Sequence, residues 1–217
     1  AAGSVESVGM DFRTELALEA FQHTASYDAA IANELHVRYV GDPASTDDVS
    51  QQSERLPSTI IASNDLLQGL RYGENAHQAA ALYVSPAHSK ANDTLVTAKV
   101  EGGKAMSYNN YSDADATLRL CRSLSTDEWP DTPHACVIVK HNNPCGAALG
   151  ATQLEAFEMA LASDPESAFG SIICFNEPVE KNTAEAIGDL FVEVLMAPAF
   201  EPAAKELLTI KTNRRLL

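Results

Sequence analysis

The stretch ACVIVKHNNPCG, residues 135–146, joins a buried-strand pattern directly to ionisable side chains. Its first five residues are apolar and partly β-branched, which is typical of a strand buried on both faces of a sheet. Lys140 and His141 follow at once. The next residues favour a turn, because Pro144 lacks a backbone donor and Gly146 permits positive φ. We therefore predict a buried strand that ends at Lys140 and turns immediately after it.

Lys140 and His141 are the candidate catalytic residues of this stretch. Neighbouring side chains of a strand point to opposite faces, so the two can converge on one ligand only where the backbone turns. Ligands of open α/β sheets bind outside the carboxyl ends of the strands, where this pair would lie. His141 can serve as a general acid/base with Lys140 as its electrostatic partner, because a neighbouring ammonium disfavours a second positive charge on the imidazole. The alternative interpretation is a solvated lysine beside a structural histidine.

The composition is that of a globular protein with a strong acidic excess. Of 217 residues, 45% are hydrophobic, and 30 acidic residues against 15 basic ones give a net charge of -15. This charge argues against binding to nucleic acid, which requires a basic surface. No apolar run is long enough for a membrane span, and the four cysteines contain no CxxC pair, which indicates reduced thiols. We therefore expect a cytoplasmic protein without a membrane segment.

A zinc site is one alternative for residues 144–148. Pro144-Cys145 matches half of the P-C-x-x-C signature of zinc deaminases, but Ala148 stands where the second cysteine is required, and the sequence contains no H-x-E. We therefore expect no bound metal. A nucleophile pair of Cys145 and His141 is another alternative, against which a buried structural thiol is the simpler interpretation.

The rest of the sequence is organised as a helical arm, a polar linker and an α/β region. Apolar residues recur at helical spacing within residues 1–40, where His23 interrupts the stripe and leaves one helix or two, and residues 41–58 are polar with two prolines. Helices and strands alternate from residue 112 onward, which predicts a mostly parallel α/β sheet. The expected strands are 79–84, 95–100, 135–140, 171–175, 191–197 and 209–217, and the expected helices are 112–124, 152–163, 182–190 and 202–208.

Three further loops carry groups suited to a planar or phosphorylated ligand. The segment LRYGENAHQ contains Arg71 and Tyr72, and EGGKAMSYNNYS contains Asn109. Phe169-Gly170 precedes the expected strand 171–175, where the glycine would let a ligand approach the backbone. Polar surface turns and a core phenylalanine are the structural alternatives.

Four segments give a specific resemblance. LRYGENAHQ, GGKAMSYNNYSDADA, ACVIVKHNNPCGAALG and ALASDPESAFGSIICFN occur in this order. Together they resemble the family of bifunctional purine-biosynthesis enzymes that join AICAR transformylase to IMP cyclohydrolase, and RTELALEAFQHTASYDAAIA resembles the end of the cyclohydrolase domain. The resemblance implies a cytidine-deaminase-like α/β/α unit without zinc, the first of two in the transformylase domain, preceded by a helical arm.

The resemblance also implies a reaction and a set of site residues. The family transfers the formyl group of the co-substrate 10-formyltetrahydrofolate to the 5-amino group of AICAR, and the full protein couples this step to IMP cyclohydrolase. His141 matches the catalytic histidine and Lys140 the adjacent lysine. The positions that match substrate-binding residues are Arg71, Tyr72, Asn109, Phe169, Gly170 and Glu193. Ala76 and Ser171 depart from the proline and glycine that are common in the family.

The same resemblance predicts the domains. Residues 1–40 would form the end of the cyclohydrolase domain, 41–58 a linker, and 59–217 the first half of the transformylase domain. The rest of the cyclohydrolase domain and a second deaminase-like unit with folate contacts would lie outside this sequence. Because the folate contacts would lie largely in that missing unit, we expect the isolated chain to be inactive. The resemblance also implies a homodimer, across which the family's sites form. The competing hypothesis is a non-catalytic nucleotide-binding or assembly module.

Overall fold

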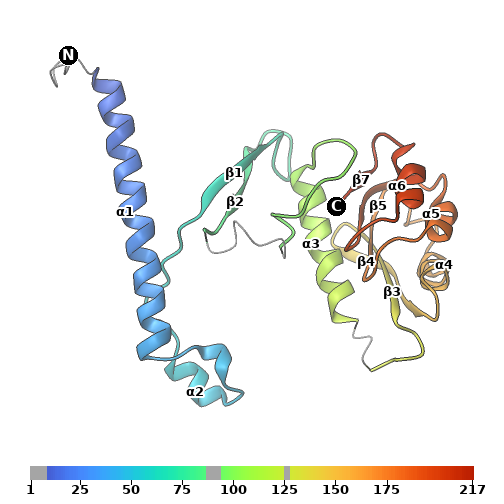
Figure 1. The fold of residues 1–217 in the computed structure, drawn as a ribbon, viewed down its shortest axis with the longest axis horizontal. Coiled ribbons are helices and arrows are strands. Elements are labelled where there is room, and N and C mark those ends of the chain that lie inside the picture. Colours follow the sequence, from blue (N-terminus) through green and yellow to red (C-terminus); the bar gives the residue numbers. More distant parts are fainter. Residues whose placement is uncertain (1–8, 87–93, 125–127) are drawn as a thin grey trace. The chain divides into compact units, whose positions relative to one another are not determined.

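The computed structural model describes residues 9–86, 94–124 and 128–217 (Figure 1). These residues form two compact units that divide at Asp65: residues 9–65 with 85–86 make up one, and the remaining described residues make up the other. In the described ranges, none of the helices combines the length and the apolarity needed to cross a membrane.

The first unit is built on a single long helix. Helix α1 (Met10–Tyr39) runs through His23 without a break. Most of its apolar side chains are exposed, and Ala29 is its buried residue. Helix α2 (Val49–Glu54) and a short 3-10 helix (Pro43–Ser45) occupy the stretch that we expected to be a linker.

The second unit contains a small sheet and a large one. Strands β1 (Asp65–Leu70) and β2 (Ala80–Val84) form the small sheet. The prediction of a strand at 79–84 is confirmed, whereas β1 was not predicted. Its burial pattern explains the omission, because five of its six residues are exposed and no apolar alternation marks it.

The large sheet has five strands in the order β4-β3-β5-β6-β7. Strand β3 runs antiparallel to both of its neighbours, whereas β5, β6 and β7 are parallel to one another. The expectation of a mostly parallel sheet is therefore wrong, and the sheet is mixed. The strands are β3 (His134–Lys140), β4 (Asn143–Gly150), β5 (Ser171–Phe175), β6 (Val192–Met196) and β7 (Arg215–Leu216).

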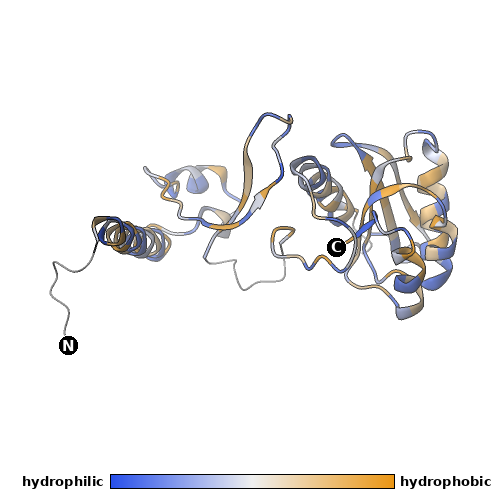
Figure 2. Cartoon of the chain, turned by 90° about the horizontal axis from the view of Figure 1, so that it is seen from above, coloured by the Kyte–Doolittle hydropathy of each residue, from blue (hydrophilic) through white to orange (hydrophobic). Residues whose placement is uncertain are grey.

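Helices cover both faces of this sheet. Helix α3 (Tyr108–Ser123) packs on one face, and α4 (Gln153–Ser163), α5 (Lys181–Ile187) and α6 (Pro202–Thr209) belong to the core of the other. The side chains of β3 alternate between the two cores: Cys136 and Ile138 join the α4 side, and Val137 and Val139 the α3 side. Figure 2 shows the apolar strands between the helical layers. The prediction of a strand buried on both faces is confirmed.

Several expected boundaries are wrong for identifiable reasons. Helix α3 starts earlier than predicted, because Ser107 caps it and forms a capping box with Asn110. Residues 95–100 form no strand: a turn joins Thr97 to Thr94 through a backbone hydrogen bond, and the strand-like composition serves to bury side chains against α3 and the sheet. Two other bounds differ from the expected ones. Helix α5 does not begin at a cap formed by Asn182. Strand β7 spans two residues, whereas we expected a strand over residues 209–217.

Gly146 has a different role from the one we predicted. It lies in β4, where its φ is not in the left-handed region, and a Cβ placed on it would sit 2.0 Å from the carbonyl oxygen of Ala160 in α4. Glycine is therefore needed for the close approach of helix to strand, and residues 144–146 belong to β4 and not to the turn.

Candidate functional site

The candidate site is built on the turn between β3 and β4. Lys140, the last residue of β3, pairs with Asn143, the first of β4, which leaves His141 and Asn142 as a two-residue loop. Their φ angles are 57° and 62°. Positive φ at both central residues is the geometry of a type I′ hairpin turn, which usually uses Asn-Gly or Asp-Gly. A histidine in this conformation is uncommon, and such strained residues are concentrated at functional sites.

Helix α3 holds this turn in place. The backbone N–H of Asn142 donates to Asp113 Oδ1 at 2.8 Å. With its amide nitrogen turned toward the helix, the Asn142 side chain also donates to Ser112 Oγ and Asp113 Oδ1, each at 3.1 Å. Ser112, where we expected the helix to begin, therefore lies inside α3, and the Ser112-Asp113 pair anchors the turn. Sequence reasoning missed this role because the partners are about 30 residues apart.

The ammonium group of Lys140 is fixed against the segment before β5. Lys140 Nζ donates to the carbonyl oxygen of Phe169 at 2.7 Å. The next residue, Gly170, has φ 77° and donates its N–H to the carbonyl oxygen of Phe191 at 2.7 Å. The Phe169 and Phe191 rings are 5.2 Å apart at 48°. The structure thus brings Lys140, Phe169 and Gly170 together, and it adds Phe191, which the sequence gave no reason to select.

His141 faces solvent beside this cluster. Its side chain is exposed, and no described residue hydrogen-bonds its imidazole ring. Asn143 Nδ2 donates to the His141 carbonyl oxygen at 2.9 Å, which supports the turn from the other side. An imidazole on a fixed backbone without a protein partner is able to exchange a proton with a ligand.

The remaining predicted residues fall into three places. Glu193 lies in β6, and its carboxylate accepts a hydrogen bond from Arg215 Nη1 at 2.5 Å, so its charge is paired. Asn109 is exposed in the first turn of α3. Arg71 and Tyr72 follow β1 in the small sheet, where the guanidinium lies 4.7 Å from the Tyr72 ring centroid and donates to its hydroxyl. No contact in the structure joins this pair to Lys140 within the described residues.

Cys145 has the surroundings of a structural thiol. It is half-buried and donates to the carbonyl oxygen of Ile138 at 3.5 Å. Burial raises its pKa, which disfavours the thiolate that a nucleophile requires. Among the described residues there is no group of three or more His, Cys, Asp or Glu side chains that could hold a metal ion.

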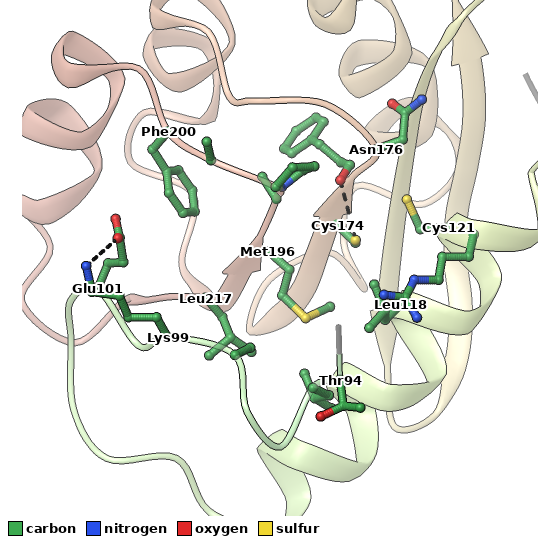
Figure 3. Close-up of a pocket in the computed structure, with 17 residues that line it drawn as sticks. Thr94, Lys99, Glu101, Leu118, Cys121, Cys174, Asn176, Met196, Phe200 and Leu217 are labelled. Atoms are coloured by element: carbon green, nitrogen blue, oxygen red, sulfur yellow. Dashed lines mark hydrogen bonds and ion pairs between the residues drawn. The ribbon is translucent and has the colours of Figure 1, made fainter. Parts of the chain in front are cut away.

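Lys140 and His141 lie beside the amino end of β5, whereas ligands of open α/β sheets bind at the carboxyl ends of the parallel strands. Strand β3 is antiparallel to β5, in the register that pairs Val139 with Ile172, so the end of β3 meets the start of β5. The carboxyl ends of β5, β6 and β7 instead line a pocket of about 980 Å³, which includes Asn176, Ala197 and Leu217 (Figure 3). Our expectation for Lys140 and His141 assumed a parallel sheet and is wrong in this respect.

The comparisons with known proteins agree with the resemblance in the sequence. The AICARFT/IMPCHase bienzyme family matches residues 2–217. The bifunctional purine biosynthesis protein PurH of Oceanobacillus iheyensis is 42% identical over 217 residues, which are 100% of this chain and 38% of that protein. The chain thus spans well under half the length of this curated relative.

Solved structures give only a distant likeness. Acinetobacter baumannii RibD, form 1, is 20% identical, with a TM-score of 0.38 over 48% of this chain and 34% of that chain. Form 2 is 18% identical, with a TM-score of 0.33 over 41% and 29%. The family match covers nearly the whole chain, and on this ground the chain belongs to the AICARFT/IMPCHase bienzyme family.

Proposed function

We propose that this chain carries the proton-transfer half of an AICAR formyltransferase site in purine biosynthesis. The observation that carries the proposal is the β3–β4 turn: His141 is exposed in a left-handed conformation, and the neighbouring Lys140 is fixed to the Phe169 carbonyl at 2.7 Å. Family membership supports the reaction, and the α/β/α layering supports the cytidine-deaminase-like unit. The substrates would be AICAR and 10-formyltetrahydrofolate, in a cytoplasmic homodimer without a catalytic metal.

The geometry suits an acyl transfer from a folate to a weakly nucleophilic amine. The lone pair of the AICAR amine is delocalised into its ring, so a base must remove a proton as the amine attacks the formyl carbon. The exposed His141 imidazole would accept this proton. Attack also places negative charge on the formyl oxygen, for which the Lys140 ammonium would be the positive partner. The Phe169 carbonyl limits where that ammonium can lie.

The substrate contacts would lie beside this pair. Gly170 presents backbone without a side chain next to the exposed ring of Phe169, which is 61% exposed. Glu193, already held by Arg215, would accept hydrogen bonds from ribose hydroxyls, and Asn109 would contribute from α3. Arg71 and Tyr72 would bind the anionic part of the nucleotide, since a guanidinium matches phosphate geometry.

Substitution of Lys140 tests the proposal in a complete enzyme. The host is a chimera in which residues 1–217 replace the matched segment of the Oceanobacillus iheyensis relative. We expect Lys140→Ala to lower kcat for formyl transfer about 100-fold or more through loss of charge stabilisation. Lys140→Arg keeps the charge but misplaces it, because the planar guanidinium cannot reproduce the ammonium position, and should also be impaired. Full activity of Lys140→Arg would mean that only net charge matters and would refute the positioned role.

A non-catalytic nucleotide-binding or assembly module is the second candidate. The observation that favours it is the long helix α1, whose apolar side chains are largely exposed. The same chimera separates the two functions. A transformylase requires that the chimera transfer formyl groups, whereas the module requires only that it bind AICAR or assemble. Binding without transfer in a folded chimera would favour the module.

A further inference from the structure

The carbonyl oxygen that holds the Lys140 ammonium belongs to a short connection, residues 164–170, which we call the 164–170 turn. This turn joins the end of α4 to the start of β5. Burial does little to fix it, because Ala168 is its buried residue and the Phe169 side chain is 61% exposed. The position of the Phe169 carbonyl therefore depends largely on hydrogen bonds.

Asp164 supplies these hydrogen bonds at the start of the turn. Its carboxylate oxygen Oδ1 accepts the Ser167 N–H at 3.0 Å, and its carbonyl oxygen accepts the Ala168 N–H at 3.2 Å. Aspartate suits this position because its short side chain can cap a backbone N–H three residues further on, and Pro165 fixes φ at the next residue. The conformation of the 164–170 turn thus begins at the Asp164 side chain.

The Asp164 carboxylate is ionised in this contact. Hydrogen bonds from Ser167 lower its pKa, and the positive charge of Lys140 acts in the same direction. An ionised carboxylate accepts stronger hydrogen bonds than a neutral carboxyl group does. The cap on the Ser167 N–H is therefore fully formed at neutral pH.

The far end of the turn has an anchor of its own. The Gly170 N–H donates to the carbonyl oxygen of Phe191 at 2.7 Å, immediately before β6 begins. Along the chain, the Phe169 carbonyl lies between this anchor and Asp164, and it accepts the hydrogen bond from Lys140 Nζ at 2.7 Å. Release of either anchor would therefore move the acceptor that fixes the ammonium.

We propose that Asp164 is a positioning residue for formyl transfer, which acts by holding the Phe169 carbonyl where it receives the Lys140 ammonium. This inference rests on the proposed function, because the place of Lys140 affects transfer only if its charge faces the formyl oxygen. Asp164 touches no substrate in this role. Loss of its cap should therefore act mainly on kcat, through a misplaced charge, and much less on KM.

Kinetics of the chimera give the first test. Asp164→Ala should lower kcat for formyl transfer about 10-fold and change KM for AICAR less than about threefold, because the ammonium is displaced from the charge that it stabilises. Asp164→Asn should keep kcat within about threefold of the unsubstituted chimera, because asparagine caps as well as aspartate does. Unchanged kcat in Asp164→Ala, or an equal loss in Asp164→Asn, would overturn the proposal.

Thr152→Ala is the matched control. Thr152 caps the opposite end of α4, where its Oγ1 accepts the Glu155 N–H at 3.1 Å. The substitution removes a cap of the same kind from the same helix, but this cap does not lead to the Phe169 carbonyl. Its kcat should equal that of the unsubstituted chimera. A loss as large as that of Asp164→Ala would mean that any weakening of α4 slows transfer, which would overturn the specific role of Asp164.

A second measurement needs no formyl transfer and so separates this inference from the proposed function. The 217-residue chain is treated with a trace of acetic anhydride, and mass spectrometry gives the acetylation of Lys140 relative to Lys181, an exposed lysine at the start of α5. In Asp164→Ala this ratio should rise about threefold or more, because an ammonium that loses a hydrogen bond releases its proton more readily. Asp164→Asn loses the same charge but keeps the cap, so its ratio should stay close to that of the wild type.

The two measurements together identify which idea fails. An unchanged ratio in Asp164→Ala, or an equal rise in Asp164→Asn, would overturn the positioning role even if the chimera is active. A raised ratio in Asp164→Ala alone, with no transfer by the unsubstituted chimera, would support the hold on Lys140 and refute the proposed function instead.

Discussion

A comparison of His141→Gly with His141→Ala isolates the backbone of the turn from its side chain. Both variants remove an exposed imidazole, so they lose the same contacts. At φ 57° an L-residue costs about 1–2 kcal/mol relative to its right-handed conformation, and glycine avoids this cost. Glycine gains about 0.5–1 kcal/mol of unfolded-state entropy, which opposes folding. The difference leaves the glycine variant more stable than the alanine variant by about 0.5–1 kcal/mol.

Urea unfolding of the 217-residue chain measures this difference. With a slope of about 2 kcal/mol per molar, the glycine variant should unfold at a urea concentration roughly 0.3–0.5 M higher than the alanine variant. The matched control is Glu158, an exposed residue inside α4. There the order should reverse, with alanine more stable by about 1 kcal/mol, because glycine is a poor helix former. Equal stability of the two His141 variants would refute the left-handed conformation of the turn.

Two further predictions concern the elements that fix the site. Gly146→Ala should destabilise the chain by about 1–3 kcal/mol, because its Cβ would lie 2.0 Å from the Ala160 carbonyl oxygen; Gly69→Ala, with nothing within 4 Å, should change thermal stability by less than about 0.5 kcal/mol. Asp113→Ala removes the acceptor of the Asn142 N–H and should cost about 1–2 kcal/mol and lower formyl transfer in the chimera. Asp115→Ala, which removes only an exposed ion pair with Arg119, should cost less than about 1 kcal/mol and leave transfer unchanged; similar losses in both variants would contradict the anchoring role of Asp113.

The strand that carries the candidate site could be predicted because its signal is local. Residues 135–139 are apolar at every position, and all of them are buried. The end at Lys140 also follows from the change in composition. A turn immediately after Lys140 was also predicted, but not the residues that form it, because Pro144 and Gly146, the usual turn residues of this stretch, lie in β4. The loop itself contains neither glycine nor proline, so the type I′ turn left no recognisable signature.

The direction of the strands could not be predicted from the alternation of helices and strands. The β3–β4 hairpin makes β3 antiparallel to β5, and this reversal moves Lys140 to the edge where β5 begins. Contacts between distant residues were equally invisible: the Lys140 ammonium meets a carbonyl 29 residues away, and Asp113 holds a turn 29 residues away. The resemblance supplied Phe169 and Gly170 as site residues, and the structure places both beside Lys140.

The arrangement of the nucleotide-binding residues stays a prediction. Arg71 and Tyr72 contact each other after β1, and Glu193 is paired with Arg215. Arg215 is a residue that sequence reasoning missed, since its role depends on the pairing of β6 with β7. If Glu193 binds ribose hydroxyls, the hydrogen bond from Arg215 fixes the position of its carboxylate, a role that no local pattern indicates.

The most direct test of the account is the single-turnover rate of formyl transfer by the chimera carrying His141→Ala. Enzyme in excess over AICAR, with saturating 10-formyltetrahydrofolate, reports the chemical step, and AICAR binding is measured separately. The account predicts a rate lowered by about 100-fold or more with AICAR affinity nearly unchanged, because His141 is proposed to move a proton and not to bind the ground state. A single-turnover rate close to that of the unsubstituted chimera would contradict it.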